Sequence, residues 1–274
     1  MTKVDYDSDS SIANALRGHD CLIITLSPRA GPDLHPRIVN AAADAGVKYI
    51  MPNYYGYGLS SSPPTDPILG GFERFVNDVR AVEDKGVKWI ALCCGFWYEF
   101  SLGMGEAWLG FDIKEKKITL YDEGKKRVNV STWKLCGDAL AKALSLPLEK
   151  LGAEEGPALA DWANKGLYIS SFLISQRDIL DSLHRILGTS DADWTIEYQP
   201  AQERYEEGMK ELADGKRTGF AKALYSKIYE ENGRGDYETG HGVDNEKLGL
   251  AKEDLDAATK RAVEMVEGGF GWKE

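Results

Sequence analysis

The sequence predicts an α/β domain built around a parallel sheet. Short apolar runs at 21–26, 47–51 and 87–94 are separated by segments in which apolar residues recur at helical spacing. A continuous apolar run of this length is typical of a strand that is buried on both faces of a parallel sheet. Strands that alternate with helices at this spacing form βαβ units, which make neighbouring strands parallel.

The helices of this first part carry recognisable end signals. A cluster of Asp and Ser at 7–11 predicts a helix start, and Gly18 ends that helix before the first strand. A second helix is predicted over 34–45, followed by Gly46 in the left-handed conformation that often closes a helix. A third helix is predicted over 72–82, where the apolar residues share one face.

The second half of the chain is less regular and predicts a smaller α+β portion. Residues 118–130 are typical of a β-hairpin, 167–173 of one strand and 194–198 of another. Further helices are expected over 135–144, 175–187, 202–231 (as one or two helices) and 253–267. We therefore divide the chain into residues 1–100 and residues 101–274, with the strand near 167–173 returning to the first sheet.

Charge and hydropathy exclude several classes of protein. The 274-residue chain has 33 Lys and Arg against 44 Asp and Glu, a formal net charge of −11, which repels nucleic-acid phosphates and anionic membrane surfaces. No stretch approaches the 18 consecutive apolar residues of a membrane span, and the polar first 20 residues do not resemble a secretion signal. We expect a cytoplasmic protein that binds a small molecule, not nucleic acid or membrane; the oligomeric state stays open.

Motif searches identify no catalytic or metal-binding pattern. The Gly-x-Gly segments at 56–58 and 103–105 do not complete the Gly-x-Gly-x-x-Gly loop that holds dinucleotide phosphates. Tyr121 and Lys125 have Tyr-x-x-x-Lys spacing but straddle a predicted turn, so they would not share a helix face. The histidines and cysteines lack metal-ligand spacing. We predict no metal site and assign no catalytic residue.

Aromatic residues gather directly after the second and third predicted strands. The five residues of this set are Tyr54, Tyr55, Phe96, Trp97 and Tyr98. Parallel sheets bind ligands at the carboxyl ends of their strands. These side chains are therefore expected to line a pocket for a small, aromatic substrate. The alternative is that they pack as core, and the two interpretations are compatible because pocket walls are themselves packed.

Three segments carry a resemblance to a known family. Residues 46–56, GVKYIMPNYYG, are similar to the family's GVKRFIPSEFG, and residues 4–25 are similar to its D…SL..AL.G.D.VI segment. Residues 86–96 look like the strand that leads into its substrate loop. The chain thus resembles the NmrA-like, or isoflavone-reductase-like, family of the short-chain dehydrogenase superfamily, common in fungi and plants. The resemblance covers essentially the whole chain and implies a Rossmann-like sheet and an NAD(P)H-dependent reductase.

The resemblance also implies where an NADP or NAD cofactor would lie. The matched positions are Asp5 and Tyr6 on the adenine side, Thr25, Leu26 and Ser27 beside the cofactor, and Pro52 and Asn53 on the nicotinamide side. The chain begins at the family's third strand, whereas the first two strands and the phosphate loop lie upstream in the family. We therefore expect an N-terminally incomplete sheet and impaired cofactor binding.

The family's catalytic lysine falls on Phe75 of this chain, which has no proton to donate. Three functions therefore stay open. The first is an NAD(P)H-dependent reductase of a small aromatic substrate. The second is a non-catalytic NmrA-like regulatory or binding protein, which the missing lysine favours. The third is an N-terminally truncated product without independent activity, which the missing strands favour.

Overall fold

The computed structural model describes residues 3–27, 30–60, 65–150, 152, 156–230 and 234–272. The chain divides into two compact units, Met1–Cys93 with Ala143–Leu167, and Cys94–Lys142 with Tyr168–Glu274. The sequence pattern places 143–167 with the C-terminal portion, whereas in the structure this segment packs with the first unit. Among the described residues, no helix has the length and apolar character needed to cross a bilayer.

The sheet of the first unit confirms the predicted parallel arrangement. Its strands are β1 (Cys21–Ile23), β2 (Tyr49–Met51), β3 (Tyr55–Gly56), β4 (Lys88–Cys93) and β9 (Lys165–Tyr168). They follow the order β1-β2-β4-β3, with β9 also paired to β4, and the pairs β1–β2, β2–β4 and β3–β4 are parallel. The register places β2 against the first half of β4 and β3 against the second half.

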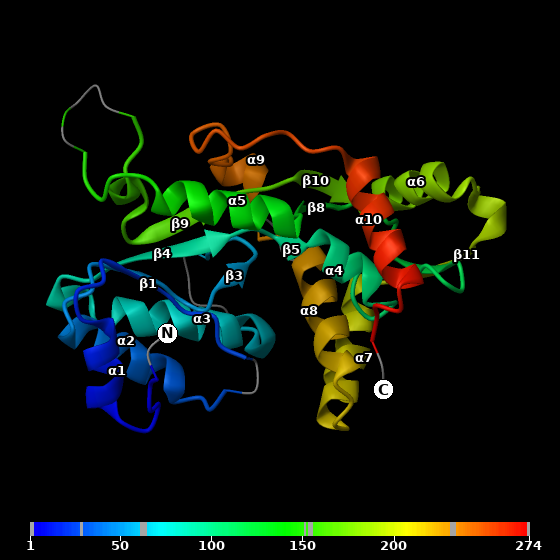
Figure 1. Ribbon diagram of the computed structural model, residues 1–274. Helices are drawn as coiled ribbons and strands as arrows, with labels where there is room; N and C mark the ends of the chain where they lie inside the picture. Colours follow the sequence, from blue (N-terminus) through cyan, green and yellow to red (C-terminus); the bar gives the residue numbers. More distant parts are fainter. Residues whose placement is uncertain are drawn as a thin grey trace. The chain divides into compact units, whose positions relative to one another are not determined.

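Three helices of the first unit lie against one another on one side of this sheet (Figure 1). They are α1 (Asp9–Leu16), α2 (Leu34–Asp44) and α3 (Pro67–Arg80), and short 3₁₀ turns lie at η1 (Glu83–Lys85) and η2 (Leu159–Trp162). Asp66 caps α3 by accepting hydrogen bonds from the amides of Ile68 and Leu69, and Pro67 suits the first helical turn because it needs no amide there. The apolar faces of α2 and α3 are buried, which contributes most of their stability.

The second unit contains two further sheets, each with a central strand. In one, β8 (Arg127–Ser131) lies between β10 (Phe172–Ser175), which is antiparallel to it, and β5 (Phe96–Trp97), which is parallel. In the other, β7 (Lys117–Tyr121) lies between β11 (Thr195–Gln199), which is parallel, and β6 (Phe111–Asp112), which is antiparallel. This mixture agrees with the predicted α+β portion.

The helices of the second unit are α4 (Tyr98–Gly103), α5 (Trp133–Leu144), α6 (Gln176–Leu187), α7 (Ala201–Ala213), α8 (Thr218–Glu230), α9 (Tyr237–His241) and α10 (Leu255–Glu267), with a 3₁₀ turn η3 (Asp191–Asp193). Five of them, α5, α6, α7, α8 and α10, occur close to predicted positions, whereas α4 and α9 lie where no helix was predicted. A capping box begins α6, because Ser175 and Asp178 exchange side-chain and backbone hydrogen bonds. Gly188 closes the same helix in the left-handed conformation.

The hairpin predicted over 118–130 is wrong. A turn is present, because Asp122 and Gly124 have positive φ and the Gly124 amide donates to the carbonyl of Tyr121. The two strands nevertheless join different sheets, since the edges of β7 are taken by β6 and β11. Pairing with a strand distant in sequence has displaced the local pairing, which a pattern of apolar residues does not reveal.

The single strand predicted over 167–173 is also wrong in its extent. The segment divides into β9, which pairs with β4, and β10, which pairs with β8. Between them, the Ser170 hydroxyl donates to the carbonyl of Phe172, and the Ser170 amide donates to the side chain of Asn245. Side chains that bond nearby backbone groups compete with a strand ladder, which explains the interruption.

Candidate functional site

The carboxyl ends of β1 and β2 are joined by one side chain. The Oδ1 atom of Asn53 accepts a hydrogen bond from the Leu26 amide at 3.1 Å, and its Nδ2 donates to the Leu26 carbonyl at 3.4 Å. Tyr55 adds a third link, because its hydroxyl donates to the carbonyl of Ile24 at 2.8 Å. These contacts bring two of the segments predicted to lie beside a cofactor together at the ligand-binding edge of the sheet.

A buried histidine supports this edge from the helix side. The imidazole of His35, on α2, is 2% exposed and lies 2.7 Å from the Asp78 carboxylate of α3. Its other nitrogen, Nε2, accepts a hydrogen bond from the Asn53 backbone amide at 3.2 Å. Burial lowers the pKa of His35 and outweighs the nearby Asp78 carboxylate, which acts to raise it. The histidine is therefore neutral near pH 7.

Sequence reasoning missed the His35–Asp78 pair. The two residues are 43 positions apart, so no local motif contains both of them. One signal was available, because His35 shares the apolar face of α2 with Ile38, Val39 and Ala42. A histidine on a buried face needs polar partners, and a helix that packs against α2 would have to supply one.

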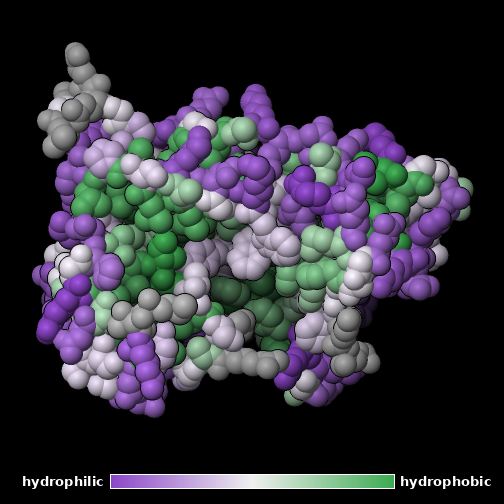
Figure 2. Space-filling model, viewed as in Figure 1, coloured by the Kyte–Doolittle hydropathy of each residue, from purple (hydrophilic) through white to green (hydrophobic). Residues whose placement is uncertain are grey.

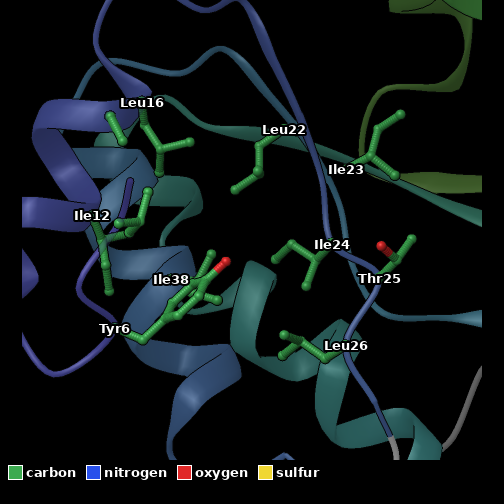
Figure 3. A pocket seen from close by; sticks show the side chains of 11 residues that line it. Tyr6, Ile12, Leu16, Leu22, Ile23, Ile24, Thr25, Leu26 and Ile38 are labelled. Carbon is green, nitrogen blue, oxygen red and sulfur yellow. The ribbon is translucent and has the colours of Figure 1, made fainter. Parts of the chain in front are cut away.

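Beside β1 lies a small cavity of about 190 Å³ (Figure 3). Along β1 and the extended residues that follow it, Leu22, Ile24 and Leu26 point toward the helices, whereas Ile23 and Thr25 point the other way. The remaining lining comes from the N-terminal segment, α1 and α2: Val4, Tyr6, Ile12, Ala15, Leu16 and Ile38. The hydroxyls of Tyr6 and Thr25 are the polar side-chain groups of this lining, and no Lys or Arg is among its described residues.

Three of the seven predicted cofactor-side residues, all of which the structure describes, line this cavity: Tyr6, Thr25 and Leu26. Asp5 instead shapes the turn before α1, because its carboxylate accepts from the Asp7 amide. Pro52 is buried next to Asn53, and Ser27 is exposed after the carboxyl end of β1. The structure thus brings the Thr25–Ser27 and Pro52–Asn53 segments together, while their role toward a cofactor stays a prediction.

Phe75 stands where the family's lysine is expected and packs against the site's histidine. Its ring meets the imidazole of His35 edge-on, with centroids 4.7 Å apart and an interplanar angle of 61°. The guanidinium of Arg74 lies over the Phe75 ring, 4.7 Å from its centroid. Phe75 therefore contributes packing and no exchangeable proton at this position.

The aromatic residues predicted to line a substrate pocket belong to different units. Tyr54 and Tyr55 lie in the first unit, where Tyr54 is buried and its hydroxyl donates to the carbonyl of Tyr57 at 3.0 Å. In this unit the hydroxyls of both predicted tyrosines donate to backbone carbonyls, one directly after β1 and one directly after β3. Their contribution to a pocket stays a prediction.

In the second unit, only part of the Phe96–Tyr98 segment is accessible. Phe96 stacks on Tyr225 with centroids 3.9 Å apart, and Tyr98 is fully buried with its hydroxyl 2.7 Å from that of Thr259. Trp97 between them is 38% exposed and meets Phe100 edge-on. Of these three side chains, Trp97 is the one that a ligand could contact without displacing core.

Other polar residues have structural partners. The Tyr121 hydroxyl is buried and donates to the Trp108 carbonyl, whereas Lys125 pairs with Glu123, so the two do not form a catalytic pair. Burial raises the pKa of the Cys21 thiol to about 11, which keeps it protonated and unreactive. In the described parts of the chain, no three His, Cys, Asp or Glu residues are grouped as metal ligands.

Comparisons with known proteins find curated relatives that are named oxidoreductases. No known protein-family profile matches the chain. The oxidoreductase aprR of Aspergillus flavus is 25% identical over 255 residues, which cover 92% of this chain and 80% of the relative. The oxidoreductase poxI of Penicillium oxalicum is 21% identical over 266 residues, covering 93% and 78%.

Two solved structures show the architecture. AtPrR2 with NADP+ and (+)pinoresinol superimposes with a TM-score of 0.71 at 15% identity, over 93% of this chain and 79% of that one. Isoflavone reductase superimposes with a TM-score of 0.69 at 17% identity, over 94% and 79%. The resemblance read from residues 4–25, 46–56 and 86–96 is thereby confirmed for the fold. The chain has the Rossmann-like α/β fold that isoflavone reductase and AtPrR2 share.

Proposed function

We propose that this chain is an NAD(P)H-dependent, reductase-type protein that binds its cofactor at the carboxyl ends of β1 and β2. The observation that carries the proposal is the pairing of Asn53 with the Leu26 backbone, because it fixes the two loops that a nicotinamide cofactor follows in such sheets. The similarity to AtPrR2, solved with NADP+, supports the same assignment. A bound cofactor would supply the hydride, and the protein would orient it.

The residues present suit part of a dinucleotide. The lining beside β1 is apolar with two hydroxyls, Tyr6 and Thr25, which suits a flat, uncharged ring or a sugar. Ligand pockets typically measure about 300–1,000 Å³, so a cavity of about 190 Å³ would accommodate a portion of NADPH. No described Lys or Arg lines it to face the diphosphate. We therefore propose that cofactor binding is weak, with a dissociation constant of roughly 0.1–1 mM.

The packing of Phe75 favours a second candidate, a non-catalytic binding protein. A general acid at this position would contribute roughly 10²–10⁴-fold to turnover. Phe75 cannot act as one, and His35 beside it already uses both ring nitrogens in hydrogen bonds. A protein of this kind would bind the nucleotide and a small molecule without reducing the small molecule.

The substrate that we propose is a small aromatic molecule. The accessible indole of Trp97 offers a face on which a planar ring could stack. AtPrR2 was solved with pinoresinol, and a second protein of the same fold is an isoflavone reductase. Pinoresinol and isoflavones are both aromatic compounds. Trp97 is therefore the first residue to test for substrate contact.

Titration with NADPH and with NADH, followed by protein fluorescence and by thermal shift, tests the cofactor site. Asn53→Ala removes the Leu26 contacts, so we expect at least about tenfold weaker binding, or about 1.4 kcal/mol. Asn77→Ala removes an exposed amide of α3 and is the matched control, with unchanged affinity expected. No saturable binding to the wild-type chain up to about 10 mM would overturn the proposal.

Turnover separates the two candidates once binding is measured. Consumption of NADPH in the presence of an aromatic enone supports the reductase. Saturable NADPH binding without turnover of a panel of aromatic enones and imines supports the binding protein.

A further inference from the structure

A continuous chain of hydrogen bonds runs through the first unit from α3 to the end of β1. It begins at the Asp78 carboxylate and passes through the imidazole of His35 to the backbone amide of Asn53. From there the side chain of the same Asn53 bonds the backbone of Leu26. The members come from four segments, namely α3, α2 and the loops after β2 and β1. No member is adjacent in sequence to another, so the chain of bonds depends on the tertiary fold.

The direction of the bonds fixes the tautomer of His35. The Asn53 amide can only donate, so Nε2 must carry a lone pair and accept. The proton of the neutral ring then resides on Nδ1 and is donated to Asp78 at 2.7 Å. The carboxylate selects this tautomer, as a carboxylate commonly does for a histidine whose second nitrogen has a fixed task. With both nitrogens engaged, His35 has no free site for a proton exchange with substrate.

Packing keeps the ring in this orientation. His35 is 2% exposed, and the edge-on ring of Phe75 limits rotation of the imidazole. A histidine buried only to fill the core could satisfy its nitrogens on its own helix. Here both partners lie outside α2, and one of them is a backbone amide of the candidate cofactor loop.

We infer that His35 and Asp78 are positioning residues that hold Asn53, and through it Leu26, at the carboxyl ends of β1 and β2. The effect on cofactor affinity rests on the proposed function. The effect on the two loops does not, because it follows from the bonds within the first unit. Loss of the imidazole acceptor frees the Asn53 amide, and the paired loops then open more often.

Hydrogen exchange followed by mass spectrometry tests the positioning directly. In His35→Phe, which keeps a ring against Phe75 but has no acceptor, peptides covering 22–27 and 50–56 should exchange at least about tenfold faster, corresponding to about 1.4 kcal/mol of lost local stability. His35→Gln places an amide oxygen near the Nε2 position and should restore most of the protection. His19→Phe alters an exposed histidine before β1 and is the matched control.

Asp78→Asn gives an independent variant that keeps the size of the side chain. An amide selects the Nδ1–H tautomer less strongly than a carboxylate, so exchange at 50–56 should rise by roughly threefold while global stability changes little. Unchanged exchange at 22–27 and 50–56 in both His35→Phe and Asp78→Asn, with both variants folded, would overturn the inference.

Cofactor titration of the same variants separates this inference from the proposed function. Faster loop exchange with a parallel loss of NADPH affinity in His35→Phe, and recovery of both in His35→Gln, supports the two together. Faster loop exchange in variants of a wild-type chain that binds no NADPH retains the positioning role and rejects the cofactor. A loss of NADPH affinity without any change in loop exchange contradicts the positioning role.

Discussion

The ring of Phe75 and the imidazole of His35 pack edge to face, with centroids 4.7 Å apart, at the position where the family resemblance leads one to expect a lysine. A lysine at this position could donate a proton, whereas Phe75 packs against His35. The side chain at this position is therefore packed against the histidine and is not a proton donor. This relationship leads to the first prediction.

Phe75→Lys should add the missing donor and remove packing at the same time. We expect NADPH-dependent turnover of an aromatic enone to rise by at least about tenfold over the wild-type rate, since general acids contribute roughly 10²–10⁴-fold. The thermal midpoint should fall, because the aromatic contact with His35 is lost. Phe75→Met, which retains apolar volume without a proton, is the control. Equal turnover in the Lys and Met variants would refute the assignment of this position.

The stability of the protein should depend on pH through His35. Its pKa in the folded state lies below the value of 6.5 that the unfolded chain has, because burial disfavours the imidazolium more than Asp78 favours it, and Arg74 also disfavours it. The unfolded state therefore takes up the proton first as the pH falls. The stabilisation is fully present above about pH 6.5 and declines from there toward the folded-state pKa.

Urea denaturation of the wild type and of His35→Gln at about pH 7.5 and about pH 5.5 measures this dependence. The free energy of unfolding should decrease more between the two pH values for the wild type than for His35→Gln, because only the wild type has the imidazole whose pKa folding lowers. An equal decrease in both proteins would mean that His35 titrates alike in the folded and unfolded states.

The helices α7 and α8 should not tolerate a methyl group where they cross. A Cβ on Gly208 would lie 2.6 Å from the Ala223 amide nitrogen, and a Cβ on Gly219 would lie 2.5 Å from that of Leu212. Gly219→Ala should cost about 1–3 kcal/mol of stability in thermal or urea unfolding. Gly137→Ala, in α5, meets nothing within 4 Å and should instead stabilise the protein by about 0.5–1 kcal/mol. Similar effects at both positions would contradict the close helix crossing.

Trp97 and Phe96 should separate substrate contact from core packing. Trp97→Ala should lower the affinity for an aromatic ligand by about tenfold while the thermal midpoint stays within a few degrees, because the indole is 38% exposed. Phe96→Ala should reduce the free energy of unfolding by about 3 kcal/mol, because its ring is buried and stacked on Tyr225. Ligand titration and urea unfolding of both variants check this. Unchanged affinity in Trp97→Ala would remove Trp97 from the proposed site.

The sequence predicts three helices and three strands of the first unit, since these elements are close in sequence and strongly patterned, whereas β3 was not predicted and β9 was predicted with the wrong extent. The apolar runs correspond to β1, β2 and β4, although β1 is shorter than its run. Figure 2 shows apolar side chains gathered on the surface of this unit. The three residues of β1 are only half-buried.

Prediction was weaker wherever a distant segment decided the outcome. The sheet that contains β7 depends on β11, and the division between β9 and β10 depends on Asn245. The site shows the same limit. Asn53 and Leu26 were predicted through the resemblance, but the bond between them and the support from His35 and Asp78 required the structure. The type of a residue indicates which hydrogen bonds it can form, whereas the tertiary fold determines which partner it has.

The two parallel pairings differ in how far apart their strands lie along the chain, and this has a consequence for the order of folding. Among the described residues between β1 and β2, α2 is the one regular element, and Asn53 meets Leu26 across 27 residues. β11 must reach β7 past β8, α5, β9, β10 and α6. Since loop closure costs entropy before any contact rewards it, the β1–α2–β2 unit should form early and the β7–β11 pair late. In a refolding experiment with pulsed hydrogen exchange, the amides of 49–51 should therefore become protected before those of 195–199.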